Sequence, residues 1–216
     1  MPHLPAVRRA QWRDVADIVP LVTDPFAASA LGAWLVPDER RRRSVLTAVI
    51  RVWIEHALLS GEAYLLHDRS AVAVWLHRFG VVPAPEGYGR RLAVACAGHL
   101  DRFLHLDDVL HAHRPAGPHH HLAFFAVAPS PHRIRRAATL LAASNARMGQ
   151  ALLPTYAEAT TTAERDLYAR HGYLAQDPFA LPGGGTAHPM WRNPGRRQPG
   201  RTLTRPAICP YAATPA

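Results

Sequence analysis

Apolar residues recur at two spacings along the chain, and together these spacings predict a mixed α/β protein. Between residues 12 and 26, the apolar positions Val15, Ile18, Val19 and Val22 would share one face of a helix. Further helices are expected at residues 38–59, at 90–113 in two pieces, at 133–148 and at 162–171. Runs with the length and composition of strands lie at residues 7–9, 62–66, 71–76, 121–127, 155–159, 173–180 and 188–192.

Proline and glycine separate these elements. Residues 81–89 are rich in both, which is typical of a loop, and Pro129-Ser130-Pro131 would end the strand at 121–127. No internal repeat is visible, so the alternation of strands and helices predicts one domain over residues 1–192. Residues 193–216 are rich in Arg, Pro and Gly with little to bury, and they are expected to form a C-terminal tail.

The composition is typical of a folded globular protein. Apolar residues make up 48% of the chain and charged residues 19%, which argues against general disorder. There is no run of about 18 apolar residues, so no membrane span is expected. Two cysteines, Cys96 and Cys209, form no CxxC motif, and the N-terminus carries no apolar signal segment. We therefore expect a cytoplasmic location with reduced thiols.

The net charge is +9, and all 25 basic residues are arginine. Such a charge permits phosphate-rich partners without requiring them. Arg40–Arg43 form a run just after an expected helix start, for which a solvated face and a contact with an RNA backbone are both open. Neither His119–His121 nor Asp107 with His111 is completed by a cysteine or carboxylate set, so no metal site is expected.

Six blocks follow one another in the order and spacing of a known family. They are VRRA…DVADIVPLV, WLVPDERRRR, GEAYLLHDRSAVAVWL, HHHLAFFAVAPS, LLPTYAEAT…ERDLYARHGY and LPGGGTAHPMWR, within residues 7–192. Together they resemble the GNAT acyltransferase superfamily, most closely its puromycin N-acetyltransferase-like actinobacterial branch. The resemblance implies a mixed, mostly antiparallel sheet of about seven strands, flanked by helices and splayed between strands four and five. In that family an acyl-CoA thioester lies in the splayed gap.

The resemblance also implies a phosphate-binding turn after the fourth strand. The family pattern is Q/R-x-x-G-x-G/A, whose backbone N–H groups hold the CoA pyrophosphate at a helix N-terminus. In this chain Ala137 fits the pattern, whereas His132 replaces Gln or Arg and Arg135 replaces the central glycine. Glu164 stands where the family has an Asn that assists CoA binding. The resemblance therefore implies a degenerate CoA-binding loop, with the donor phosphates expected at His132, Arg133, Arg135, Arg136 and Ala137.

The chemical centre of the family is retained. Tyr168, in LYARHGY, matches the tyrosine that protonates the leaving thiolate, a role that suits a phenol. Glu158, on the expected fifth strand beside the gap, is a candidate for removing the amine proton directly or through water, and His120 and His121 are further candidates. Backbone N–H groups that match the place where the family polarises the acyl carbonyl belong to Phe125, Ala126 and Val127.

A retained proton donor beside an altered cofactor loop predicts an acyltransferase with a changed donor. We expect amide formation on the amine of a small molecule, in a secondary-metabolite pathway such as antibiotic biosynthesis. Aminoacyl-tRNA fits the donor, because it is an activated ester and a polyanion that extra arginines would bind; no cofactor is otherwise firmly implied. Two alternatives stay open: an acetyl-CoA-dependent N-acetyltransferase of small molecules, for resistance or self-protection, and a catalytically silent GNAT-fold binding protein.

Overall fold

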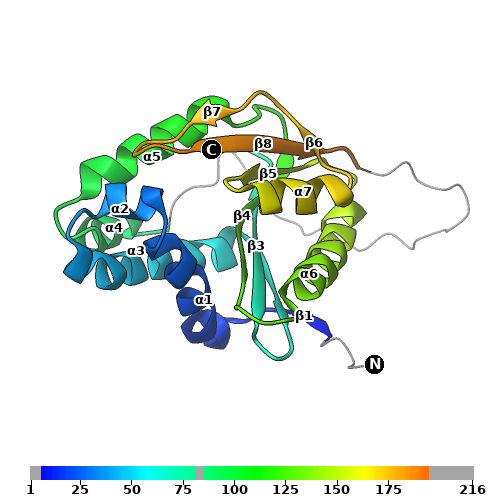
Figure 1. Ribbon diagram of the computed structural model, residues 1–216, viewed down its shortest axis with the longest axis horizontal. Coiled ribbons are helices and arrows are strands. Elements are labelled where there is room, and N and C mark those ends of the chain that lie inside the picture. The colour runs from blue at the N-terminus through cyan, green and yellow to red at the C-terminus, as the bar shows by residue number, and fades with distance from the viewer. Residues whose placement is uncertain (1–5, 81–84, 195–216) are drawn as a thin grey trace, which may run out of the picture.

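The computed structural model describes residues 6–80 and 85–194, which fold around an eight-stranded sheet (Figure 1). The strand order is β1-β2-β3-β4-β5-β8-β6, and β7 pairs with β8 outside this path. Of the expected tail, Asn193 and Pro194 are described, and residues 195–216 lie outside the described part of the chain. The strands are β1 (Val7–Arg9), β2 (Gly61–Leu66), β3 (Ala71–Arg78), β4 (His119–Val127), β5 (Thr155–Ala159), β6 (Leu174–Ala175), β7 (Phe179–Ala180) and β8 (Thr186–Arg192).

Helices cover both faces of the sheet. The α-helices are α1 (Val15–Ala27), α2 (Ala30–Leu35), α3 (Glu39–Ser60), α4 (Tyr88–Ala95), α5 (Leu100–His113), α6 (Arg133–Met148) and α7 (Thr162–Arg170); the short 3₁₀ helices are η1 (Trp12–Asp14) and η2 (Gly149–Ala151). Figure 1 shows α6 and α7 on the side of the sheet opposite α1 and α3. Among the described residues, every helix is too short or too polar to cross a lipid bilayer.

Each face of the sheet has its own apolar cluster. One cluster joins Ile18 of α1 and Leu46 of α3 to Val72 of β3, and the other joins Leu140 of α6 and Leu167 of α7 to the sheet. Because successive side chains of β3 point to opposite faces, this one strand contributes to both clusters. Burial of these side chains, at about 25 cal/mol per Å² of apolar surface, is what fixes the sheet between its two helical layers.

The β4–β5 pair is the one parallel pair among the described strands. Its pairing begins at His120 opposite Thr155 and ends at Leu122 opposite Ala157, although β4 continues to Val127. The strands therefore separate beyond Leu122, as the resemblance implies. The β3–β4 register shifts at this point, because Val74 pairs with Phe124 and Trp75 with Leu122, so β4 carries one extra residue, Ala123, where the separation begins.

One local prediction is wrong, and one short helix was not predicted. Residues 173–180 form two short strands instead of one, because Pro178 has no N–H to donate and the pairing with β8 changes register between them. The sheet, expected to have about seven strands, consequently has eight. Helix α2 was not expected; it is capped by Ser29, whose side chain accepts from the Gly32 N–H.

Candidate active site

The gap between β4 and β5 is bordered on the β4 side by Phe124, Phe125 and Val127, which are half-buried. This stretch of β4 still pairs with β3, Phe125 lying opposite Ala73 and Val127 opposite Ala71. Since successive N–H groups of a strand alternate in direction, at least one N–H between Phe125 and Val127 turns away from β3 toward the gap. The expected oxyanion-binding segment Phe125–Val127 therefore lies at the gap.

Tyr168 lies on α7 and is 2% exposed. Its ring meets Phe125 edge-on at 6.2 Å between centroids and lies 5.6 Å from Tyr173. Burial, followed by the negative charge of Glu164 and to a smaller extent that of Glu158, raises the pKa of the Tyr168 phenol well above its ordinary value. The hydroxyl is therefore protonated at neutral pH, which is the state a proton donor needs.

Glu158 and His121 form a pair beside the gap. The Nε2 atom of His121 lies 2.7 Å from Oε2 of Glu158, and both side chains are largely buried. Burial alone would raise the pKa of Glu158, but His121 and then Arg114 hold it below its ordinary value. With the carboxylate ionised, Nε2 of His121 carries the proton of this bond, and Nδ1 is the ring nitrogen left for a ligand. Nδ1 is buried and has no partner among the described residues.

The surroundings of this pair are polar as well. The fully buried side chains His119 and Tyr156 contact each other and Trp191 through their rings. The Nε2 of His119 and the Nε atoms of Arg78 and Arg114 are buried without a partner in the part of the chain that the structure describes. Buried polar atoms without partners are costly, so such a group is typical of a site that binds a polar ligand or water.

The sequence prediction did not include Arg78, Arg114 or Tyr156 in the site. They come from the end of β3, the residue after α5 and the second position of β5, and only the tertiary fold brings them together. The signal that could have found them is the histidine run at the start of β4, since a strand rich in buried imidazoles needs polar neighbours.

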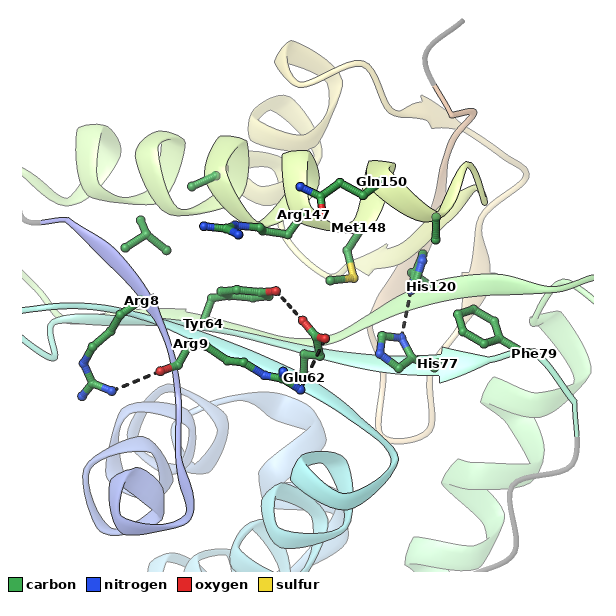
Figure 2. Close-up of a pocket in the computed structure, with 13 residues that line it drawn as sticks. Arg8, Arg9, Glu62, Tyr64, His77, Phe79, His120, Arg147, Met148 and Gln150 are labelled. Atoms are coloured by element: carbon green, nitrogen blue, oxygen red, sulfur yellow. Dashed lines mark hydrogen bonds and ion pairs between the residues drawn. The ribbon is translucent and has the colours of Figure 1, made fainter. Parts of the chain in front are cut away.

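His120 does not belong to this site, although the sequence left it open as a base. It faces the opposite side of the sheet from His121, because neighbouring residues of a strand alternate. Its Nδ1 lies 2.9 Å from Nδ1 of His77 (Figure 2). Of the two histidines, His121 is therefore the one that the fold brings to Glu158.

The start of α6 is where the donor phosphates were expected. The N-cap His132 makes no side-chain cap bond, and the side chains of His132, Arg133 and Arg135 are exposed. Arg136 instead donates to Ser130 Oγ at 3.0 Å and to Asp68 Oδ2 at 2.8 Å, and so ties the β2–β3 turn to the helix. Ala137 is buried in the apolar cluster of α6. Amides of an uncapped first turn beside exposed guanidinium groups fit a phosphate-bearing donor.

Glu164 has a structural explanation. Its carboxylate accepts from the Thr160 and Thr161 N–H groups at 2.9 and 3.1 Å, and the Thr161 hydroxyl accepts from the Glu164 N–H. This capping box satisfies the N-terminus of α7, the helix that carries Tyr168. The negative charge of Glu164 is thus compensated by N–H groups at the start of α7. Its repulsion of an anionic donor is reduced accordingly.

No model of a known protein family matches the chain, and no curated protein sequence matches it. Solved structures do match. One, from Corynebacterium glutamicum, was solved as histone acetyltransferase HPA2 and related acetyltransferase; it is 22% identical, covers 90% of this chain and 99% of its own, and has a TM-score of 0.67.

Two further structures extend this likeness to proteins with small amine substrates or products. The polyamine N-acetyltransferase of Drosophila melanogaster, which forms N-acetylagmatine, is 13% identical over 87% of this chain and 99% of its own, with a TM-score of 0.58. The C-terminal condensation domain of Ebony, in complex with β-alanyl-dopamine, is 12% identical over 88% and 100%, with a TM-score of 0.56. These likenesses show that the chain has the GNAT fold.

Proposed function

We propose that this protein is an N-acyltransferase that transfers an acyl group to the amine of a small molecule. The observation that carries the proposal is the splayed β4–β5 pair, with Tyr168 on one side of the sheet and the His121–Glu158 pair on the other. An acyl donor and an amine would meet between these groups. The GNAT fold of named acetyltransferases supports the same conclusion.

His121 is the group that would accept the proton of the amine. Its Nδ1 has no partner in the described chain, and Glu158 would hold the ring through Nε2 in the tautomer that leaves the Nδ1 lone pair for the amine proton. A carboxylate that orients an imidazole base is a common arrangement in enzymes. The role that the sequence suggested for Glu158 thus changes from direct base to positioning residue.

Tyr168 and β4 would stabilise the two charges that develop during transfer. An N–H in the segment Phe125–Val127 would hydrogen-bond the carbonyl oxygen as it becomes negative. The Tyr168 hydroxyl, which stays protonated, would give its proton to the leaving sulfur or oxygen. Attack by the amine forms the C–N bond, the bond to the leaving group breaks, and the amine proton goes to His121.

Acetyl-CoA is the donor that we propose. It would supply an activated thioester carbonyl and a thiolate leaving group, with its phosphates at the N-terminus of α6 near Arg133. The acetyltransferases among the structural matches support this choice. Aminoacyl-tRNA, the donor expected from the altered loop, has no comparable support.

The test is a donor screen with the purified protein. Acetyl-CoA should raise the melting temperature and, with a panel of polyamines and arylalkylamines, release free CoA thiol. Labelled aminoacyl-tRNA with the same amines is the second arm. Transfer from aminoacyl-tRNA without any thermal shift from acetyl-CoA would overturn the proposed donor, and no transfer from either would favour the silent binding protein.

A further inference from the structure

A cavity of about 530 Å³ lies under the C-terminal half of α6, against β1 to β4 (Figure 2). Its walls include Glu62, Tyr64, His77, Phe79, His120 and Arg147. His120 stands at the start of β4, whereas β4 and β5 separate only beyond Leu122. None of Tyr168, His121 and Glu158 lines the cavity. It is therefore distinct from the candidate active site, and a volume of this size suits a small organic ligand.

The cavity carries an excess of positive charge. Arg8 is neutralised by Asp14, which it contacts through two hydrogen bonds of 2.7 and 2.8 Å. Arg9 lies 3.3 Å from Glu62, the one carboxylate among the lining residues. Arg147 has no ion pair among the described residues, and its charge acts on the Tyr64 phenol across the cavity. An anionic group of a ligand would find its partner at Arg147.

His120 contributes a hydrogen-bonding atom without a partner. The residue is 3% exposed, and its Nδ1 shares a hydrogen bond of 2.9 Å with Nδ1 of His77. Its Nε2 is buried and unpartnered within the described chain. Because one proton is shared between the two Nδ1 atoms, Nε2 is a donor in one tautomer and an acceptor in the other. A hydroxyl group of a ligand can hydrogen-bond to Nε2 in either tautomer, since a hydroxyl both donates and accepts.

The remaining wall suits a flat ring. Phe79 is 48% exposed and stacks on His77, with 5.1 Å between centroids and 13° between the planes. Met148, which is 3% exposed, lines the cavity from α6. An aromatic ring in the cavity would bury apolar surface against these side chains and against Tyr64.

We propose that this cavity is a second binding site, for a small aromatic monocarboxylate that also carries a hydroxyl group. The carboxylate would bind Arg147, the ring would pack beside Phe79, and the hydroxyl would bond to Nε2 of His120. The planar guanidinium fork of Arg147 matches a carboxylate, and the nearby negative charge of Glu62 opposes a doubly charged phosphate. The proposal does not depend on acyl transfer, because it concerns binding without donor or acceptor.

Calorimetric titration of the full chain with para-hydroxycinnamate tests it, with two matched ligands. Para-hydroxycinnamyl alcohol lacks the carboxylate and should bind about tenfold more weakly, as expected for a lost charge-assisted bond. Cinnamate lacks the hydroxyl and should bind about threefold to tenfold more weakly. Arg147→Gln should remove the preference for the acid over the alcohol. Arg51→Gln, at an exposed position of α3, should leave it unchanged.

The proposal fails if the three ligands bind equally, if none binds in the millimolar range, or if Arg147→Gln and Arg51→Gln have the same effect. Inorganic phosphate is the competing anion. If it displaces para-hydroxycinnamate at lower concentration than cinnamate does, the site is a phosphate site and the proposed ligand class is wrong. Circular dichroism of both variants is the control for folding. If both are folded, a loss of binding is attributable to the cavity.

Discussion

At the scale of single residues, two neighbouring tyrosines of the protein differ in one decisive respect. Tyr173 donates its hydroxyl proton to Asn145 at 2.8 Å, whereas the Tyr168 hydroxyl has no hydrogen-bond partner in the described chain. Both rings pack in the same cluster. A hydroxyl held by a structural bond contributes to stability, while an unbonded hydroxyl beside the gap is available to a reacting group.

Replacement of each tyrosine by phenylalanine therefore separates catalysis from stability. Tyr168→Phe should lower kcat about 10- to 100-fold, since it removes a proton donor, with little change in melting temperature. Tyr173→Phe should keep kcat and cost about 1 kcal/mol of unfolding free energy through its lost hydrogen bond. Steady-state kinetics with thermal denaturation measures both. Equal kcat in the two variants would exclude Tyr168 as the donor of the proton.

The His121–Glu158 pair predicts non-additive kinetics. His121→Gln removes the proposed base, and Glu158→Gln removes the group that orients it, so each should lower kcat by about 10-fold or more with a smaller change in KM. The double variant should be no slower than His121→Gln, because Glu158 acts only through His121. Multiplied effects in the double variant would show that Glu158 acts independently.

Sequence reasoning reached part of this site for an identifiable reason. Tyr168 and Glu158 lie in segments with regular spacing, so their elements could be placed. The resemblance then suggested a role for Tyr168, and the place of Glu158 on the expected fifth strand made it a candidate. The bond between His121 and Glu158 joins residues 37 positions apart, and it exists only because β4 and β5 are adjacent. Arg136, expected at the phosphates, bonds to Asp68 across 68 positions, which no local pattern indicates.

At the scale of elements, strands and helices with strong periodicity were predicted closely, whereas three of the short ones were not. Helix α6 begins and ends where the apolar spacing placed it, and β5 coincides with the expected strand. The six-residue α2 and the two-residue β6 and β7 carry too few positions to show a period. Their places are set by packing, as the loop between β7 and β8 shows.

That loop meets α2 at Gly183. The glycine has φ +82°, and a Cβ there would lie 2.3 Å from Cβ of Trp34. Gly183→Ala should therefore cost about 1–3 kcal/mol of unfolding free energy, from both strain and collision. Gly184→Ala is the matched control, because Gly184 has a similar φ of +85° but open space around its Cβ position. Urea denaturation should show the larger loss for Gly183→Ala, and equal losses would mean that the contact with Trp34 has no energetic role.

At the scale of the whole molecule, burial favours the neutral state of three histidines on the sheet. Burial lowers the pKa of His77 and His119, and it lowers that of His120 to about 4, with the charge of His77 acting in the same direction. Glu62 opposes this shift for His77 and His120 without reversing it. The folded protein therefore binds fewer protons at these sites than the unfolded chain does.

Stability should consequently fall as the pH drops below the ordinary histidine pKa. Above about pH 6.5 the imidazole of His120 is neutral in both states, and between that value and about 4 only the unfolded chain takes up its proton. From pH 7 to pH 5 this single group should remove about 2 kcal/mol of unfolding free energy. The lowered pKa of Asp14, about 2, acts in a more acidic window, below its ordinary value.

Urea denaturation at pH 7 and pH 5 measures this loss of unfolding free energy. His120→Gln should make it smaller by about that amount, whereas His67→Gln, at an exposed position, should not change it. An equal loss in all three proteins would mean that His120 is protonated inside the fold, and the neutral imidazole pair on which the cavity geometry depends would then be wrong.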